Sequence, residues 1–234
     1  MLNYTCFINN QFINSNSVDD LVVINPADEQ VVAKIVNANN EDVNYALSVA
    51  HEAQKKWKKL TSIERGQYLN LLADKIIERA AIIGRVLALE SGKSLEDATN
   101  EAIYAAEVTR YHAGWARRIE GEIIPSDTPN ENLMLFREPI GIAACLIPFN
   151  YPVYTLLRKI APALITGNTV IVRPSNNTPC SALEIAKAVQ ESGIPDGVIN
   201  ILVMSHDVAA QVCTDSKVGI ITLTGSVGAG RQIL

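Results

Sequence analysis

The sequence contains few of the residues that hold metal ions or form disulfides. Among its 234 residues are four cysteines and three histidines. The cysteines are scattered, which indicates neither a disulfide framework nor a Cys-x-x-Cys metal or redox site. The histidines stand singly, without the His-x-x-x-His spacing that is typical of zinc sites. We therefore expect no metal site, and buried, reduced thiols at Cys6, Cys145, Cys180 and Cys213.

Long apolar runs and an excess of basic residues are also missing. No uninterrupted apolar run reaches the length of roughly 18 residues that a membrane-spanning helix needs. The first residues, Met1 to Cys6, lack the basic and then apolar pattern of a secretory signal. The chain has 20 Lys and Arg against 25 Asp and Glu, a formal net charge of −5. Phosphate backbones are bound by clustered basic residues, so we expect a cytoplasmic protein without a nucleic-acid or membrane partner.

The composition that remains, 48% hydrophobic and 19% charged, is that of an ordinary globular protein. Residues 1–118 open with short apolar runs separated by turn residues, which predict strands over the first forty positions, with a tight hairpin turn at Asn9-Asn10. Apolar residues then recur at helical spacing. A capping box formed by Thr61 and Glu64 starts one helix, and another is expected to run from Ser94 to about Arg118.

Residues 119–140 differ from their surroundings. Prolines and glycines surround two short apolar runs, Ile123-Ile124 and Leu133 to Phe136, with an acidic polar turn between them. Two such runs joined by a turn predict a β-hairpin. We expect it to project from the body and to serve in pairing subunits.

In residues 141–234 continuous apolar runs alternate regularly with helical stretches. Strands buried on both faces that alternate with helices predict an α/β fold with a parallel, doubly wound sheet. Ligands of such sheets bind at the carboxyl ends of the strands. The loops at those ends are therefore the candidate sites.

Four of these loops carry polar residues or glycines. Asn150, flanked by two prolines, presents an amide that can donate to a developing oxyanion, although an Asn in a turn also commonly bonds its own backbone. Arg173 carries the charge and the donors to bind a phosphate or a ribose hydroxyl. The alternative is a charged residue that faces solvent at a strand end. Residues 204–207 form the third loop. The stretch 224–230 suits a phosphate at a helix start, but it lacks the Gly-x-Gly-x-x-Gly order, so an ordinary tight turn stays open.

These loops belong to a series of motifs that resembles the aldehyde dehydrogenase superfamily over essentially the whole chain. Segment 116–136 is most similar to the lactaldehyde and glycolaldehyde dehydrogenase branch. The motifs, in chain order, are Asn25-Pro26-Ala27, Glu90-Ser91-Gly92-Lys93, Pro148-Phe149-Asn150-Tyr151-Pro152, residues 161–169, residues 193–200 and Thr224-Gly225-Ser226.

The resemblance implies NAD(P)-dependent oxidation of an aldehyde to a carboxylic acid, through a thiohemiacetal on a cysteine that lies beyond this chain. Asn150 matches the residue that holds the oxyanion. Arg158 matches a position in the substrate tunnel and would bind a small hydroxyaldehyde such as lactaldehyde; an exposed helix Arg is the alternative. The positions that match the cofactor site are Leu146, Ile147, Pro148, Phe149, Arg173, Ser175, Asn176, Thr224, Gly225, Ser226 and Gly230.

Three departures from the family pattern concern the cofactor. Phe149 stands where Trp is usual, which keeps a packing ring. Arg173 replaces the usual Lys and Asn176 the usual Glu, so the carboxylate that chelates ribose hydroxyls is missing. We therefore expect either NAD or NADP to serve. Residues 204–207 replace a Gly-rich stretch, which predicts reduced dinucleotide affinity.

The resemblance also implies a Rossmann-like cofactor domain in two parts, 1–118 and 141–234, and a homodimer or homotetramer bridged by the hairpin 119–140.

The chain ends at Leu234, within the last expected helix, and the family's nucleophilic Cys and general-base Glu lie further on. We expect the catalytic domain to be missing and the chain alone to be inactive. A catalytically silent truncated product that binds nucleotide or merely assembles is the alternative. Another doubly wound nucleotide-binding enzyme would need a different order of loops.

Overall fold

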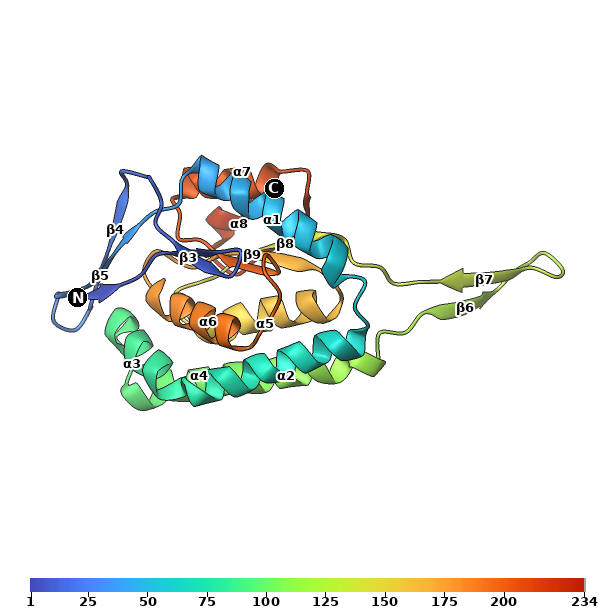
Figure 1. Cartoon of the computed structure of the whole chain (residues 1–234), viewed down its shortest axis with the longest axis horizontal. Coiled ribbons are helices and arrows are strands. Elements are labelled where there is room, and N and C mark those ends of the chain that lie inside the picture. The colour runs from blue at the N-terminus through green and yellow to red at the C-terminus, as the bar shows by residue number, and fades with distance from the viewer. Residues whose placement is uncertain (234) are drawn as a thin grey trace.

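Six strands form the central sheet of the computed structural model, which describes residues 1–233 (Figure 1). They lie in the order β11-β8-β9-β10-β2-β3. The first four are parallel, and β2 and β3 add to β10 as an antiparallel hairpin. The chain therefore builds outward from β8 through β9 to β10 and then returns to place β11 on the other side of β8. The strands are β2 (Cys6–Ile8), β3 (Gln11–Ile13), β8 (Ile142–Leu146), β9 (Thr169–Arg173), β10 (Ile199–Ile201) and β11 (Val218–Leu223).

Helices cover both faces of this sheet, and the predicted doubly wound α/β fold is confirmed. Two helices, α1 (Asn40–Trp57) and α7 (His206–Thr214), lie on one face, while α5 (Pro152–Ile165) and α6 (Cys180–Glu191) lie on the other (Figure 1). Outside α5 and α6 is a further helical layer, which explains why α5 and α6 are apolar on more than one side. This outer layer consists of α2 (Ser62–Glu78), α3 (Ala80–Ser91) and α4 (Leu95–Ala113).

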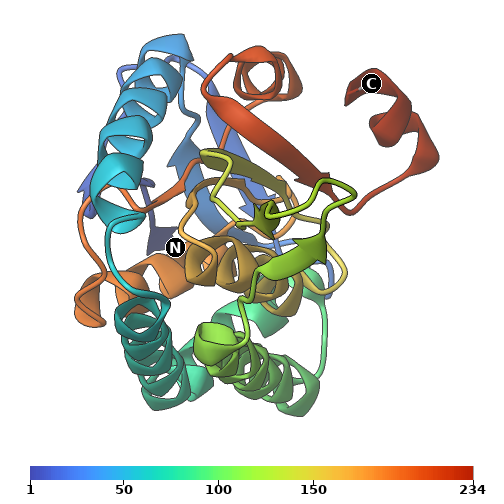
Figure 2. The ribbon, with the colours of Figure 1, turned by 90° about the vertical axis from the view of Figure 1, so that its right-hand side faces the viewer.

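The strands differ in how far they are buried. All residues of β8 and β10 are buried, and so are all but the last of β9. The expectation of strands buried on both faces is wrong for β11, in which Ile220 is 47% exposed. Among residues 1–233 this strand lies at the edge of the sheet and pairs only with β8. The last helix, α8 (Val227–Ile233), has no buried residue and stands clear of the other helices (Figure 2).

Local sequence signals account for most helix boundaries. Asn39 and Thr61 cap α1 and α2 through complete capping boxes, and the Ser94 hydroxyl caps α4. The expected end of the fourth helix near Arg118 needs correction: α4 ends at Ala113, and Gly114–Arg117 continue as a 3-10 turn. Tightening of the last turn in this way is common at helix ends. Within residues 1–233 no helix combines the length and the apolar character needed to cross a membrane.

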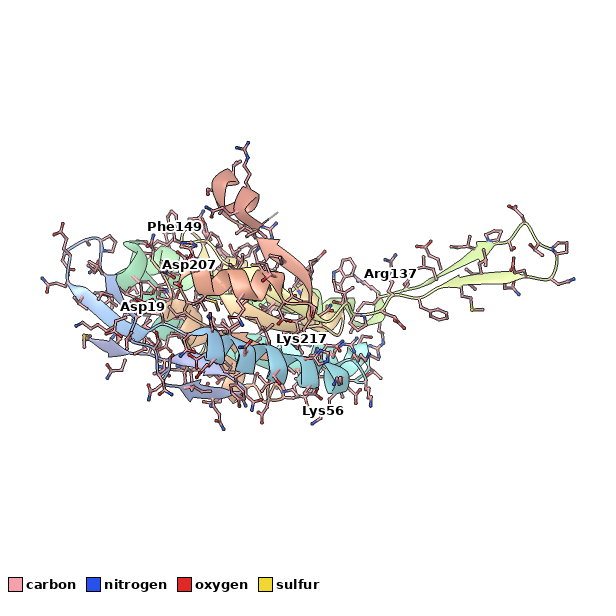
Figure 3. All side chains as sticks on the ribbon, turned by 90° about the horizontal axis from the view of Figure 1, so that it is seen from above. Asp19, Lys56, Arg137, Phe149, Asp207 and Lys217 are labelled. Atoms are coloured by element: carbon pink, nitrogen blue, oxygen red, sulfur yellow. The ribbon has the colours of Figure 1, made fainter. Side chains whose placement is uncertain are left out.

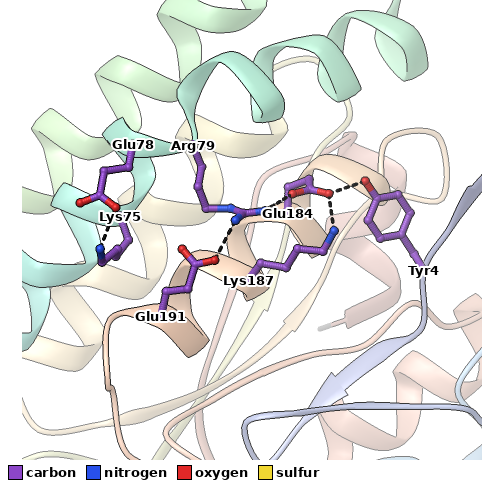
Figure 4. Close-up of polar contacts among 7 residues, drawn as sticks. All are labelled: Tyr4, Lys75, Glu78, Arg79, Glu184, Lys187 and Glu191. Atoms are coloured by element: carbon purple, nitrogen blue, oxygen red, sulfur yellow. Dashed lines mark hydrogen bonds and ion pairs between the residues drawn. The ribbon is translucent and has the colours of Figure 1, made fainter.

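A buried carboxylate joins the N-terminal segment to the helical layers. Glu184 on α6 accepts a hydrogen bond from the Tyr4 hydroxyl at 2.6 Å and pairs with Arg79 and Lys187, each at 2.7 Å (Figure 4). Its side chain is only 3% exposed. Tyr4 follows β1 (Leu2–Asn3), which belongs to a second sheet with β4 (Asp20–Ile24) and β5 (Val31–Val36) in the order β1-β5-β4.

The predicted hairpin is present and projects far from the body (Figures 1 and 3). It consists of β6 (Glu122–Pro125) paired with β7 (Asn132–Leu135), and every residue of both strands is exposed. Arg137 lies at its base, where Nε donates to the Glu120 carbonyl at 3.0 Å (Figure 3). A hairpin of two exposed strands is only marginally stable by itself in water.

Candidate functional site

Three parallel strands end side by side at one edge of the sheet. Leu146 at the end of β8 is in register with Arg173 of β9 on one side and with Leu223 of β11 on the other. The loops that follow, 147–151, 174–179 and 224–226, therefore meet at this edge, which we call the rim. The order of strands reverses between β8 and β11, and in open α/β sheets the ligand crevice lies at this point.

Asn150 lies on the loop after β8, next to that reversal point. Its side chain makes no hydrogen bond to any of residues 1–233, so the alternative of a turn Asn bonded to its own backbone is not realised. Asn150 and Arg158 line the same cavity of about 710 Å³ between α4 and the start of α5. The wall of this cavity is aromatic and includes Tyr104, Tyr111, Tyr151 and Tyr154.

The loop residues before Asn150 divide into two kinds. The side chains of Leu146 and Ile147 are 8% and 4% exposed and belong to the core. A ligand at the rim would therefore meet their backbone and not their side chains. Pro148 is half-buried, and Phe149 is 58% exposed.

On the β9 side, Arg173 is half-buried and held by two long hydrogen bonds. Its Nε donates to the Met204 carbonyl at 3.3 Å, and Nη2 donates to Asn176 Oδ1 at 3.4 Å. Burial lowers the pKa of the Arg173 guanidinium. The Ser175 hydroxyl accepts from the Asn177 amide at 3.3 Å and so takes part in the turn itself. Met204 is a partner of Arg173 that the sequence did not indicate, because Arg173 ends β9 and Met204 lies in the loop after β10.

A smaller cavity of about 410 Å³ adjoins this side of the rim. Phe149 and Asn176 line it together with β4 and the end of α3. Glu90 also lines this cavity, and its buried carboxylate accepts hydrogen bonds from the amides of Cys180 at 2.7 Å and Ser181 at 2.9 Å. Burial raises the pKa of Glu90 to about 7, although these hydrogen bonds favour the ionised form. Glu90 thus caps α6, whose own N-cap residue, Pro179, offers no side-chain hydrogen bond.

On the β11 side the predicted residues are more open. Thr224, Gly225 and Ser226 are exposed, Gly230 is half-buried, and the Ser226 hydroxyl accepts from the Ala229 amide at 3.1 Å. A Cβ added to Gly225 would lie 3.4 Å from a Leu223 methyl carbon, an ordinary contact, and Gly225 is not among the glycines with positive φ. The fold of residues 1–233 therefore does not itself require glycine at this position.

Comparison with known proteins identifies the family. The model of the aldehyde dehydrogenase family matches residues 12–234. The chain is 39% identical over 229 residues to lactaldehyde dehydrogenase of Escherichia coli K12, covering 97% of this chain and 48% of that protein. A crystal structure of Escherichia coli lactaldehyde dehydrogenase superimposes with a TM-score of 0.96 at 38% identity, over 99% of this chain and 49% of the other.

A second solved structure is an NADP-dependent glyceraldehyde-3-phosphate dehydrogenase from Bacillus halodurans C-125 complexed with NADP. It superimposes with a TM-score of 0.95 at 30% identity, over 100% of this chain and 50% of the other. The chain thus spans about half the length of the relatives that it matches. By both sequence and structure, the chain belongs to the aldehyde dehydrogenase family.

Proposed function

We propose that this chain is the dinucleotide-binding part of an NAD(P)-dependent enzyme that oxidises a small hydroxyaldehyde, such as lactaldehyde, to the carboxylic acid. The observation that carries the proposal is the rim, where Asn150 has an uncommitted amide and lies between the Arg173 and Gly225 loops. A nicotinamide dinucleotide bound there supplies the hydride acceptor. The lactaldehyde dehydrogenase relative supports the substrate class.

Asn150 has the chemistry that the reaction needs from this chain. When a thiolate adds to an aldehyde carbonyl, the oxygen becomes an oxyanion and gains from hydrogen-bond donors already in place. The Asn150 amide is such a donor, and it lines a cavity of about 710 Å³, room for a small substrate. Arg158 and the tyrosine hydroxyls of the same cavity would bind a polar hydroxyaldehyde.

The rim fits a dinucleotide. The backbone of Leu146 and Ile147 and the exposed ring of Phe149 would contact the nicotinamide half, whereas Arg173, Ser175 and Asn176 would hold the adenosine ribose. Gly225 needs no positive φ and has room for a Cβ, so a closely approaching pyrophosphate gives a reason for glycine that the fold does not. Thr224, Ser226 and Gly230 complete this turn.

The cysteines of the chain do not suit the nucleophile. Cys6, Cys145 and Cys180 are at most 2% exposed, and burial raises the pKa of Cys6 and Cys145 to about 12. The expectation of a buried thiol is wrong for Cys213, which is half-buried, but burial raises the pKa of this thiol as well. A buried, protonated thiol is inert toward an aldehyde. We therefore place the nucleophile outside these residues, and expect the chain alone to show no NADH formation with lactaldehyde. Turnover by the chain alone would contradict this placement.

The cofactor assignment is tested by titrating this chain with NAD and with NADP and following nicotinamide or tryptophan fluorescence. The long bond from Arg173 to Asn176 leaves the guanidinium free to turn toward a 2′-phosphate. We expect the affinities for NAD and NADP to lie within about a hundredfold of each other, a difference below about 2.7 kcal/mol. The NADP complex of the glyceraldehyde-3-phosphate dehydrogenase supports this expectation.

Two variants at one position sharpen the titration. Asn176→Glu adds a carboxylate that can chelate ribose hydroxyls and repel a 2′-phosphate, so it should favour NAD over NADP by about tenfold or more relative to the parent. Asn176→Gln introduces a side chain as long as that of Glu but uncharged, and it should leave the ratio of the NAD and NADP affinities unchanged. If Asn176→Glu strengthens NAD binding no more than Asn176→Gln does, the ribose-site assignment is wrong.

We also propose that the hairpin 119–140 joins subunits into a homodimer or homotetramer. Its apolar side chains are unusually exposed, with Ile123 at 77%, Met134 at 61% and Phe136 at 76%. Such a surface indicates burial in an assembly. Met134→Asp should shift the native protein toward monomer in sedimentation analysis, whereas Thr128→Asp in the turn should not. An unchanged mass for Met134→Asp would contradict the hairpin interface.

The alternative, a catalytically silent product, is distinguished by the intact mass of the native protein and by the coding sequence after Leu234. A continuation with an upstream Glu-Leu-Gly-Gly segment and a Gly-x-x-Cys loop would support the enzyme. A stop codon would support the silent product.

A further inference from the structure

Helix α5, which begins directly after the Asn150 loop, has no cap of its own. Its N-cap residue is Tyr151, which makes no capping bond, and Pro152 is its first residue. The next amides, of Val153 and Tyr154, have no partner inside the helix because they belong to its first turn. Val153 is fully buried, so its amide cannot turn to water. An unpaired donor at this depth would be costly.

Glu101 supplies the missing acceptor from a distant point in the chain. It lies in the middle of α4, and its Oε1 accepts from the amides of Val153 at 2.9 Å and Tyr154 at 3.1 Å. Its side chain is 1% exposed. In dinucleotide-binding folds such a helix start commonly receives a phosphate of the ligand. Here the protein's own carboxylate occupies it, so α5 is closed to an anionic ligand.

The other oxygen of Glu101 is committed as well. Oε2 pairs with the ammonium group of Lys93, which lies in the turn between α3 and α4 and is 20% exposed. The same ammonium lies over the Tyr151 ring, 3.8 Å from its centre. Lys93 and Glu101 therefore contact the chain immediately after Asn150 at two places: Lys93 lies over the Tyr151 ring, and Glu101 bonds the first amides of α5. We call this arrangement the α5 clamp.

We propose that Glu101 and Lys93 are positioning residues, and that the α5 clamp holds the Asn150 amide toward the cavity. The proposal rests on the proposed role of Asn150 as the oxyanion donor. Asn150 is joined on one side to the buried strand β8 and on the other to the clamped residues, so the clamp fixes the second end of its loop. Both oxygens of Glu101 are engaged, Oε1 by the two amides and Oε2 by Lys93, which suits a residue that holds the loop rather than one that takes a proton. A displacement of about 1 Å at a reacting group can lower a rate by about a hundredfold.

The test measures kcat and KM of the full enzyme that contains this chain. Glu101→Gln weakens the acceptor and removes the partner of Lys93, and we expect kcat to fall by about tenfold or more, with the KM for NAD changed less than about threefold. Lys93→Met should lower kcat in the same direction, and Lys93→Arg, which keeps a cation over the ring, should restore it. Asp74→Asn, which breaks the exposed pair of α2 and α4 with Arg110, is the matched control and should leave both constants unchanged.

A double variant separates the clamp from the proposed function. If Glu101 acts through Asn150, Glu101→Gln should lower kcat little further in an Asn150→Ala background. An unchanged kcat for Asn150→Ala would overturn the role of Asn150 itself. Suppose that Asn150→Ala lowers kcat strongly and that Glu101→Gln lowers it by the same further factor in this background as in the parent. That result would overturn the clamp but not the role of Asn150, and a normal kcat for Glu101→Gln alone would do the same. Should Glu101→Gln not fold, the less buried Lys93→Met and Lys93→Arg pair gives the same answer, because equal kcat values for the two would overturn the clamp.

Discussion

The two sides of the rim share one register of strands but differ in how the rest of the chain holds them. On the β9 side, the strand is buried, Arg173 is bonded to the Met204 loop, and Glu90 caps the helix that follows. On the β11 side, Ile220 is 47% and Val227 74% exposed, and α8 buries no residue (Figure 2). The difference therefore lies in packing and not in strand pairing, and burial of apolar surface supplies most of the stability of such elements.

The two sides of the rim should respond differently to the dinucleotide that we propose as ligand. The half of the rim around Arg173 is held by packing and hydrogen bonds, so the proposed dinucleotide would have less entropy to overcome in ordering that half. The Gly225 loop is followed by α8, which has few apolar contacts, and segments of this kind open with small free energies. We therefore expect ligand binding to order the β11 side more than the β9 side.

The largest expected contrast is between two isoleucines of the sheet. Ile171 in β9 is 1% exposed, and Ile220 in β11 is 47% exposed. Ile171→Ala leaves a cavity among close-packed neighbours and should lower the free energy of unfolding by about 2–5 kcal/mol. Ile220→Ala should cost less than about 1 kcal/mol. Urea unfolding of both variants measures these changes in the free energy of unfolding. Equal losses for the two variants would contradict the difference in packing between the two sides of the rim.

Glu90 gives the well-packed side a pH dependence. Burial raises its pKa in the folded protein to about 7, against an ordinary value of 4.5. Between these values the folded state keeps a proton that the unfolded chain releases, so the contribution of Glu90 to stability is complete below pH 4.5 and is lost as the pH rises through 7. The loss amounts to about 3 kcal/mol in order of magnitude.

The measurement is urea unfolding between pH 5 and pH 8 of the parent chain and of Glu90→Gln, which cannot ionise. The free energy of unfolding of the parent, taken relative to the variant, should fall as the pH rises. Glu78→Gln, in an exposed pair with Lys75, serves as the control and should show no such slope. A parent-to-variant difference that is constant with pH would show that Glu90 stays in one ionisation state throughout.

The sequence predicted the elements whose causes are local. Asn9 and Asn10 have φ of 54° and 61°, as the expected tight hairpin turn requires, and the Thr61 capping box starts α2. Alternation of apolar strands with helices predicted the order of layers and therefore the rim. The catalytic and cofactor roles of its residues stay predictions.

What the sequence did not show depends on contacts between distant residues. Glu101 caps α5 by accepting from an amide 52 positions later in the chain, and no local spacing indicates such a bond. Glu90 lies 90 positions before the amide that it accepts from. The burial of β11 also depends on distant contacts: its apolar residues match those of a central strand, and only the three-dimensional packing shows which face is covered.

The smallest expected effect concerns the link between the two sides. Lys159 on α5 is half-buried, and its ammonium donates to the Thr222 hydroxyl of β11 at 2.9 Å. Lys159→Met keeps much of the packing but removes the donor, so stability should fall by about 1 kcal/mol. Since β11 has few other attachments, its amides should exchange hydrogen faster while those of β9 stay protected. Lys56→Met on the exposed surface of α1 should change neither (Figure 3). Faster exchange in β9 as well would mean that the two sides of the rim open together and that the contrast between them does not extend to their dynamics.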